Sequence, residues 1–195
     1  MLNKPLEKYR IILASGSPRR QQFLKELGLN FVVMLKEVDE TYPDELKEGA
    51  ITEYLARKKA LPFGEILQPG DILITSDTIV WHEGKALGKP RNADEAYHIL
   101  QSLSGKQHKV ITSACVTTAQ QQITLTDTSS VTFGKLSDEA IHYYIKTYKP
   151  YDKAGAYGIQ EWIGHIGITH IDGSYNTVMG LPTHLLYRAL EEIGK

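Results

Sequence analysis

The sequence predicts an α/β fold in which helices flank a mixed central β-sheet. Apolar runs typical of buried strands alternate with helical patterns in the first part of the chain. A long hairpin then interrupts this alternation and brings antiparallel strands to the sheet. The 195 residues show no internal repeat, low-complexity tract or linker. This is expected of a single domain, 1–195, which is either undivided or has two lobes around a cleft.

Local signals define the first strands and helices. Apolar runs predict three buried strands, at residues 9–14, 31–35 and 72–76. Between the first two, Ser17 is a suitable N-cap, Pro18 suits the first helical position and Gly28 ends the helix. Helical spacing of apolar residues over 51–59 predicts a second helix, which Pro62 ends or kinks.

Similar signals define the rest of the chain. The segment 82–85 is typical of a hairpin turn, and Asn92 with Glu95 resembles a capping box that opens a helix. Ser137 is expected to start another helix and Thr183 to cap the last one. Three further strands are predicted, at 109–118, 122–133 and 166–171, of which the first two form the long hairpin.

Composition excludes several classes of protein. A net charge of −1 argues against binding nucleic acid through bulk charge, so no nucleic-acid partner is expected. No apolar segment approaches the roughly 18 residues of a membrane span. The first residues also lack the apolar run of a signal peptide, so we expect a cytoplasmic protein without a membrane partner. The one cysteine, Cys115, lies in an apolar stretch and is expected to be a small core residue.

The segment from Ser15 to Arg20, SGSPRR, lies between a predicted strand and a predicted helix. Free N–H groups at a helix N-terminus bind anions, and the hydroxyls of Ser15 and Ser17 add donors. Arg19 and Arg20 stand in the first turn, where their charge opposes the helix dipole unless a polyanion is bound. Two interpretations stay open, an ordinary capped helix with solvated arginines and a phosphate site. The G-x-x-x-x-G-K-[ST] phosphate loop is absent.

Acidic residues form a second constellation. The segment 37–48 contains Glu37, Asp39, Glu40 and a proline, and it is expected to be a loop. Asp77 and Thr78 follow the strand 72–76, at the kind of strand end where α/β folds place ligands. Magnesium takes one or two carboxylates together with water and substrate phosphates. The alternative interpretation is that Glu37, Asp39, Glu40 and Asp77 are ordinary polar residues of solvated loops.

Isolated polar residues complete the candidates. Lys59 shares a helix face with apolar residues, so it either reaches the surface or projects into a cleft. Lys89 lies in the stiff segment 88–91, and Gln160 ends a glycine-rich stretch where its amide could read the edge of a base. The same stretch could be a structural turn. The seven histidines show no metal-ligand spacing.

Taken in order, these pieces resemble the Maf family of nucleoside triphosphate pyrophosphatases, from Ile11 to about Leu190. The resemblance is carried by LASGSPRR at 13–20, EVDE at 37–40, LARKKA at 55–60, SDTIV at 76–80, GKP at 88–90, LSG at 103–105, DKAGAYGIQ at 152–160, GSY at 173–175 and MGLP at 179–182. Each motif is weak alone, and the ordered set is specific.

The resemblance implies a two-lobed α/β fold around a cleft, similar to that of inosine triphosphate pyrophosphatases, and, as a rule, a homodimer. It implies a nucleotide diphosphatase that cleaves between the α and β phosphates and uses Mg²⁺ or Mn²⁺. By family analogy Asp77 is the general base, and Glu40 matches the metal-site glutamate, with Asp77 as a second metal ligand. Phosphate-contacting positions are matched by Ser15, Arg20, Lys59 and Lys89, and Ser17 belongs to the same loop.

Three positions bear on the substrate. The family branch that acts on dTTP and UTP has arginine, threonine and glutamine where this chain has Arg19, Thr78 and Gln160. The branch acting on 7-methyl-GTP tends to have an aromatic residue in place of Arg19. One departure is TSD at 75–77, where the family often has Gly-Ala-Asp, so that Ser76 takes the place of alanine. We therefore expect hydrolysis of dTTP and UTP.

Three alternatives remain from the sequence. Some Maf relatives are linked to inhibition of septum formation, so the chain could be a nucleotide-binding regulator of cell division. It could also be a pyrophosphatase of the 7-methyl-GTP type, or an enzyme that removes modified pyrimidine triphosphates. Only the regulator could dispense with Asp77 and a metal ion.

Overall fold

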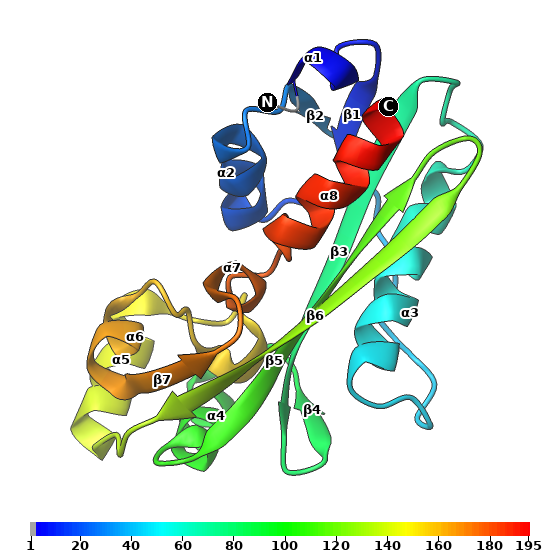
Figure 1. The fold of residues 1–195 in the computed structure, drawn as a ribbon. Helices are drawn as coiled ribbons and strands as arrows, with labels where there is room; N and C mark the ends of the chain where they lie inside the picture. The colour runs from blue at the N-terminus through cyan, green and yellow to red at the C-terminus, as the bar shows by residue number, and fades with distance from the viewer. Residues whose placement is uncertain (1–2) are drawn as a thin grey trace. The chain divides into compact units, whose positions relative to one another are not determined.

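A computed structural model describes residues 3–195 of the chain (Figure 1). The helical elements are α1 (Asn3–Leu6), α2 (Pro18–Glu26), α3 (Gly49–Ala60), η1 (Leu61–Phe63), α4 (Ala93–Leu103), α5 (Asp138–Tyr148), η2 (Ala154–Ala156), α6 (Trp162–Gly167), α7 (Tyr175–Val178) and α8 (Thr183–Gly194). The strands are β1 (Arg10–Leu13), β2 (Phe31–Val33), β3 (Asp71–His82), β4 (Lys85–Leu87), β5 (Gln107–Thr117), β6 (Gln122–Phe133) and β7 (Ile168–Asp172).

The strands form a mixed sheet, as the sequence predicts. Its order is β2-β1-β3-β5-β6-β7, with β4 paired to β3 outside this path. β1 is parallel to both β2 and β3, whereas β3 pairs with β4 and β6 pairs with β7 in antiparallel fashion. The predicted hairpin of β5 and β6 is confirmed, and a turn in which Thr118 and Gln121 are hydrogen-bonded joins them.

The chain divides into two compact units. Unit 1 comprises residues 1–77, 112–127 and 180–195, and unit 2 comprises residues 78–111 and 128–179. β3, β5 and β6 each contribute residues to both units. Within the part of the chain that the structure describes, no helix combines the length and the apolar character that a membrane span requires.

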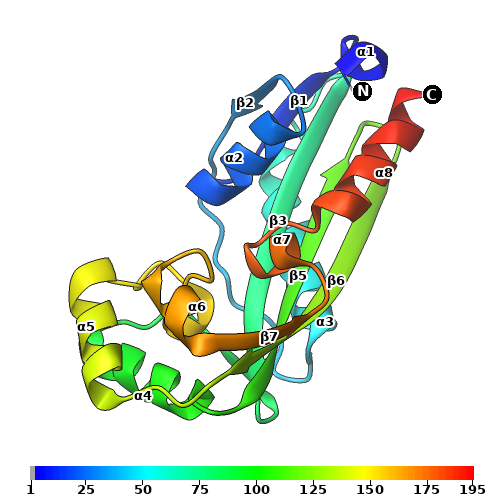
Figure 2. The same ribbon diagram turned by 60° about the vertical axis from the view of Figure 1, so that its left-hand side comes forward.

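Unit 1 has helices on both faces of its strands. Figures 1 and 2 show α2 and α8 on one face and α3 on the opposite face. A forked ion pair ties the start of β1 to the start of β3, with Arg10 Nε 2.9 Å from Asp71 Oδ1 and Arg10 Nη2 2.6 Å from Asp71 Oδ2. The two residues are also partners in the parallel register. Hydrogen bonding to Arg10 holds the pKa of Asp71 below its ordinary value.

The position of α3 is fixed by buried hydroxyl groups on its underlying strands. Thr75 on β3 donates to the carbonyl oxygen of Ala56 at 2.6 Å. The hydroxyls of Thr52 on α3 and Ser113 on β5 are 2.6 Å apart, and both side chains are fully buried. Buried hydroxyls are costly without partners, so these paired contacts select one position of the helix. Lys59, near the end of α3, is placed by them.

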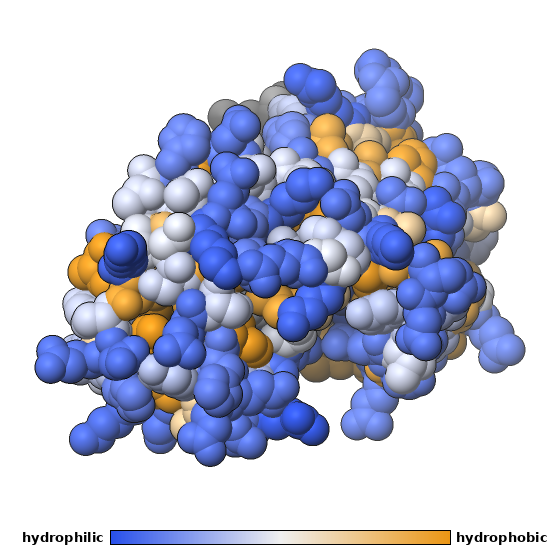
Figure 3. Space-filling model, turned by 90° about the horizontal axis from the view of Figure 1, so that it is seen from below, coloured by the Kyte–Doolittle hydropathy of each residue, from blue (hydrophilic) through white to orange (hydrophobic). Residues whose placement is uncertain are grey.

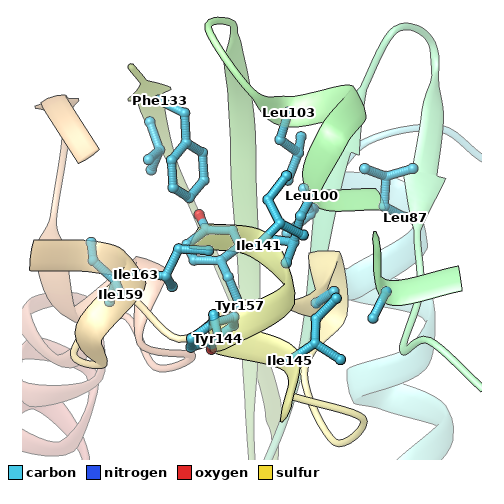
Figure 4. Close-up of a cluster of buried hydrophobic side chains, with 14 of the residues drawn as sticks. Leu87, Leu100, Leu103, Phe133, Ile141, Tyr144, Ile145, Tyr157, Ile159 and Ile163 are labelled. Atoms are coloured by element: carbon cyan, nitrogen blue, oxygen red, sulfur yellow. The ribbon is translucent and has the colours of Figure 1, made fainter. Parts of the chain in front are cut away.

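Unit 2 is built around a hydrophobic core with several aromatic rings. Figure 4 shows this core, to which α4 contributes Leu100 and Leu103 and α5 contributes Ile141, Tyr144 and Ile145. Phe133 of β6 meets Tyr157 edge to face, with ring centroids 5.1 Å apart. Such contacts add about 0.5–1.5 kcal/mol to the effect of burial. The core therefore holds the segment that follows η2 against α5 and β6.

The cap signals of the sequence are confirmed at three helices. Ser17, Asn92 and Ser137 are the N-caps of α2, α4 and α5, and each side chain accepts a hydrogen bond from the N–H group three residues on. Gly28 follows the end of α2 with a φ of 73°, a left-handed conformation that glycine adopts without strain.

Some element boundaries differ from the prediction. Thr183 is the first residue of α8 and Pro182 is its N-cap, so the prediction of Thr183 as the cap is wrong. Glu95 accepts from the N–H of Arg91 rather than from that of Asn92, so the capping box is not reciprocal. β7 begins at Ile168, because α6 occupies the preceding residues.

The largest difference concerns β3. The strand was expected to end before Asp77, yet it continues to His82, and Asp77 and Thr78 lie within it. Its later residues, Thr78 to Trp81, are β-branched or aromatic, and Val80 and Trp81 pair with β4. The polar residues therefore do not end the strand, whose later part is paired with β4.

On the face shown in Figure 3, hydrophilic side chains predominate and hydrophobic ones lie in small, separate areas. Single exposed hydrophobic residues of this kind are normal and do not indicate a binding surface.

Candidate functional site

The segment between β1 and α2 is built as a helix N-terminus. The hydroxyl of Ser17 accepts from the N–H of Arg20 at 3.5 Å, and the hydroxyl of Ser15 accepts from the N–H of Ser17 at 3.3 Å. Ser15 is buried, whereas Gly16 is exposed. The two hydroxyls therefore order the first turn of α2, and its N–H groups with the helix dipole favour an anion.

Arg20 extends away from its own helix and ties three segments together. Its Nε donates to the carbonyl oxygen of Gly180 at 2.8 Å, and its Nη1 donates to the carbonyl oxygen of Ser76 at 3.0 Å and reaches Ser15 Oγ at 3.4 Å. Burial lowers the pKa of Arg20 from its ordinary value, and the nearby charge of Asp77 raises it. A guanidinium remains charged under such shifts, so Arg20 brings a cation to the start of α2.

Sequence reasoning missed Gly180 and Ser76 as partners of Arg20. Gly180 has a φ of 107°, a backbone conformation that favours glycine. Its carbonyl oxygen accepts from Arg20 and also from the Ser76 hydroxyl, at 3.3 Å. The MGLP motif at 179–182 was the signal that could have drawn attention to this position. The serine at 76, which departs from the family pattern, contributes this second hydrogen bond.

Three of the predicted site residues form one charged cluster. The Nζ atom of Lys59 lies 2.6 Å from Asp77 Oδ1 and 2.8 Å from Glu40 Oε1. The side chains of Lys59 and Asp77 are 17% and 9% exposed, whereas that of Glu40 is 47% exposed. An ammonium thus lies between a nearly buried carboxylate and one that faces solvent. The alternative in which Lys59 only reaches the surface does not hold.

The alternation of side chains along β3 explains this geometry. Thr75 and Asp77 are two residues apart, so they point to the same face of the strand. Thr75 bonds to Ala56 on α3, and Asp77 meets Lys59 one turn further along the same helix. Ser76 points to the opposite face, where its hydroxyl meets Gly180. One strand therefore presents the carboxylate to α3 and a hydroxyl to the Arg20 side.

Glu40 lies in the acidic loop, and its neighbours are anchored to α3. Lys58 donates to the carbonyl oxygen of Thr41 at 2.9 Å and lies 3.7 Å from Asp39 Oδ2. Asp39 accepts from both the N–H and the hydroxyl of Thr41, and the hydroxyl contact lowers the pKa of Asp39. Consecutive lysines on α3 thus hold the loop on both sides of Glu40. Sequence reasoning gave Lys58 no such role.

A divalent cation fits this donor set if substrate phosphates complete its coordination shell. Among residues 3–195 no group of three histidine, cysteine or acidic side chains is arranged to hold a metal ion. The two carboxylates on Lys59 nevertheless suit Mg²⁺, which takes one or two carboxylates and completes its shell with water and substrate phosphates. Glu40 and Asp77 would therefore hold such an ion together with a phosphate-bearing substrate.

The remaining predicted residues belong to unit 2, except Arg19, which lies in the first turn of α2 beside Arg20. Thr78 lies in β3, Lys89 follows β4, and Gln160 lies between η2 and α6. The N–H of Gly155 donates to the carbonyl oxygen of Gly88 at 3.1 Å, which brings the segment before Lys89 next to η2.

Gly155 is required at this contact. Its φ is 70°, and a Cβ atom there would lie 2.6 Å from Val80 Cγ2. A side chain would therefore force η2 away from β3. The glycine-rich stretch is a structural turn, and it also carries Gln160 at its end.

Comparison with known proteins shows which family the chain resembles. The sequence model of a family described as Maf-like protein matches residues 10–193. The dTTP/UTP pyrophosphatase of Flavobacterium johnsoniae is 57% identical and covers 97% of this chain and 98% of its own length. The protein of the same name from Bacteroides thetaiotaomicron is 51% identical over 96% of this chain and 98% of its own.

One solved structure bears on the fold. The Staphylococcus aureus Ham1 protein aligns over 95% of this chain and 100% of its own, with a TM-score of 0.53 and 14% sequence identity. At this identity the likeness supports the mixed α/β fold and nothing about the reaction.

Proposed function

Because the chain belongs to the family of Maf-like proteins, we propose that it hydrolyses dTTP and UTP to the nucleoside monophosphate and pyrophosphate. The observation that carries the proposal is the cluster of Lys59, Asp77 and Glu40. A nearly buried carboxylate beside a cation, with a second carboxylate at the surface, suits the hydrolysis of a phosphoanhydride. The names of the relatives support the choice of dTTP and UTP.

The triphosphate is bound by positive charge and by N–H groups. Ser15, Ser17 and the first turn of α2 offer donors to phosphate oxygens, and Arg20 adds a guanidinium near the same turn. The family resemblance adds Lys59 and Lys89 as further cations. The net charge of −1 supports local rather than bulk attraction of the anion.

Asp77 acts as the general base. It accepts a proton from water, the water oxygen forms a bond to the α phosphorus, and the bond from that phosphorus to the bridging oxygen breaks. Pyrophosphate leaves with the bridging oxygen, and the nucleoside monophosphate remains. Lys59 orients Asp77 and offsets negative charge that develops on phosphate oxygens. Glu40 and Asp77 would hold a divalent cation, which when bound would supply charge neutralisation at the phosphates.

The nucleobase of the substrate is selected by Arg19, Thr78 and Gln160. The glutamine amide can both donate and accept a hydrogen bond, which suits the edge of thymine or uracil. This assignment rests on the family resemblance together with the ordered position of Gln160 between η2 and α6. We further propose that the enzyme is a cytoplasmic homodimer that requires Mg²⁺ or Mn²⁺. Sedimentation of the purified protein tests the dimer.

The deciding experiment measures pyrophosphate release from dTTP, UTP, CTP, 7-methyl-GTP and modified pyrimidine triphosphates with each metal. We expect turnover of dTTP and UTP, and a loss of at least roughly 100-fold in kcat with Asp77→Asn while dTTP binding is retained. Hydrolysis by Asp77→Asn near the wild-type rate would refute the assignment of Asp77 as the general base. Binding of dTTP by the wild-type protein without pyrophosphate release would instead favour a regulator of cell division.

A further inference from the structure

A buried tyrosine of α5 is linked to the turn that carries Gln160. Tyr144 is fully buried in the core of unit 2 (Figure 4). Its hydroxyl accepts from the N–H of Gly158 at 3.0 Å and donates to the carboxylate of Glu161. One hydroxyl group therefore joins two residues that stand on either side of Gln160.

An ion pair closes the same turn from its other end. Lys153 Nζ lies 3.2 Å from Glu161 Oε1, and the two side chains are 9% and 17% exposed. The pair joins the start of η2 to the start of α6, so it links the two ends of the segment that contains Gln160. Lys153 also lies 2.7 Å from Asp152, whose side chain is exposed. Glu161 thus receives a charge on one oxygen and the hydroxyl of Tyr144 on the other.

Close packing transmits this arrangement to Gln160. A Cβ atom at Gly158 would lie 2.8 Å from Glu161 Cδ and 3.1 Å from Gln160 Nε2. The absence of a side chain at 158 lets the carboxylate of Glu161 and the amide of Gln160 lie against the backbone. The backbone also turns tightly, because the N–H of Glu161 donates to the carbonyl oxygen of Gly158 at 3.0 Å. A shift of Glu161 or Gly158 would therefore move the Gln160 amide.

We propose that Tyr144, acting with the Lys153–Glu161 ion pair, is a positioning residue that fixes the Gln160 amide and thereby sets the preference for thymine and uracil over cytosine. The inference rests on the proposed function, because it takes Gln160 as the residue that reads the base. Tyr144 acts through Gln160 and has no part in the chemical step.

The chemistry of the phenol suits this role. Burial, and to a lesser extent the hydrogen bond to Glu161, raise the pKa of Tyr144 well above its ordinary value. The hydroxyl therefore keeps its proton and remains a donor to Glu161 throughout the pH range in which enzymes work. A hydrogen bond to a charged partner is stronger and more directional than one between neutral groups.

The test compares Tyr144→Phe with Tyr143→Phe. Both variants delete one hydroxyl from the same helix, but Tyr143 is half exposed. The readout is the ratio of kcat/KM for dTTP to that for dCTP. For Tyr144→Phe we expect this ratio to fall roughly tenfold, mainly through a higher KM for dTTP, with kcat changed less than about threefold. Tyr143→Phe should leave the ratio at the wild-type value.

Two further variants separate the possible failures. Gln160→Ala should lower the same ratio, and Glu161→Gln, which keeps an acceptor for Tyr144 but removes the charge that holds Lys153, should lower it in the same direction. An unchanged ratio in Tyr144→Phe, while Gln160→Ala lowers it, would overturn the positioning role and leave the proposed function intact. An absence of dTTP hydrolysis by the wild type would instead refute the proposed function. Should Tyr144→Phe fail to fold, as circular dichroism would reveal, Glu161→Gln decides, and an unchanged ratio there overturns the inference.

Discussion

The Nζ atom of Lys59 on α3 lies 2.6 Å from the carboxylate of Asp77 on β3, the strand that faces this helix. Both side chains are largely buried, so each charge offsets the desolvation of the other. The second carboxylate, Glu40, lies 2.8 Å from the same ammonium. Lys59 is therefore the centre of the charged cluster, and its removal has defined consequences.

Lys59→Met should reduce kcat/KM for dTTP by at least roughly 100-fold, because Asp77 loses the cation that orients it and the phosphates lose a positive partner. Steady-state pyrophosphate release measures the effect. Lys58→Met is the matched control, since Lys58 precedes it on α3 and bonds to Thr41 instead. Equal losses in the two variants would show that the effect comes from the acidic loop rather than from Asp77.

Arg20→Lys should lower the free energy of unfolding by about 1–3 kcal/mol, because a lysine cannot reproduce the forked contacts to the carbonyl oxygens of Gly180 and Ser76. Urea denaturation measures this. Arg19→Lys, in the same turn, should change the unfolding free energy by less than about 0.5 kcal/mol. A destabilisation of similar size in both variants would contradict the anchoring role of Arg20.

Glu40→Gln should raise the Mg²⁺ concentration needed for half-maximal activity by roughly tenfold or more, because a neutral amide is a weaker ligand than a carboxylate. Titration of Mg²⁺ into chelator-treated enzyme measures this. The chelated wild type should release no pyrophosphate until metal is returned. Glu37→Gln, at an exposed position of the same loop, is the control. A metal requirement unchanged by Glu40→Gln would exclude Glu40 as a ligand.

His108 should make the protein sensitive to acid. It is buried against Phe133, its Nε2 atom lies 2.8 Å from the hydroxyl of Tyr157, and its Nδ1 atom has no hydrogen-bond partner among the described residues. Burial, with a smaller contribution from the nearby His82, lowers the pKa of His108 to about 3. The unfolded chain binds the proton first, so stability is lost as the pH falls from about 6.5 towards 3.

The expected slope is about 1.4 kcal/mol per pH unit over that range. Urea denaturation at several pH values between 7 and 5 measures it. His108→Gln removes the titrating group and should flatten the slope, whereas His165→Gln, at an exposed position, should not. An equally steep slope in His108→Gln would assign the acid sensitivity to other groups.

The sequence by itself determined the elements whose signals are local. Ser17 and Asn92 cap their helices because a side-chain oxygen reaches an N–H group only three residues away. Gly28 ends α2 because its own backbone adopts a left-handed conformation. The ordered motifs also predict the family, and they point to Lys59, Glu40 and Asp77 as site residues.

The tertiary structure alone decided which of these residues meet and where β3 ends. Arg20 and Gly180 are 160 residues apart, and no local pattern links an arginine to a distant carbonyl oxygen. The spacing of Lys59 was compatible with either solvent or a site until the packing of α3 on β3 placed it beside Asp77. β3 continues through a polar stretch because neighbouring strands satisfy its backbone, and this depends on residues far away in the chain.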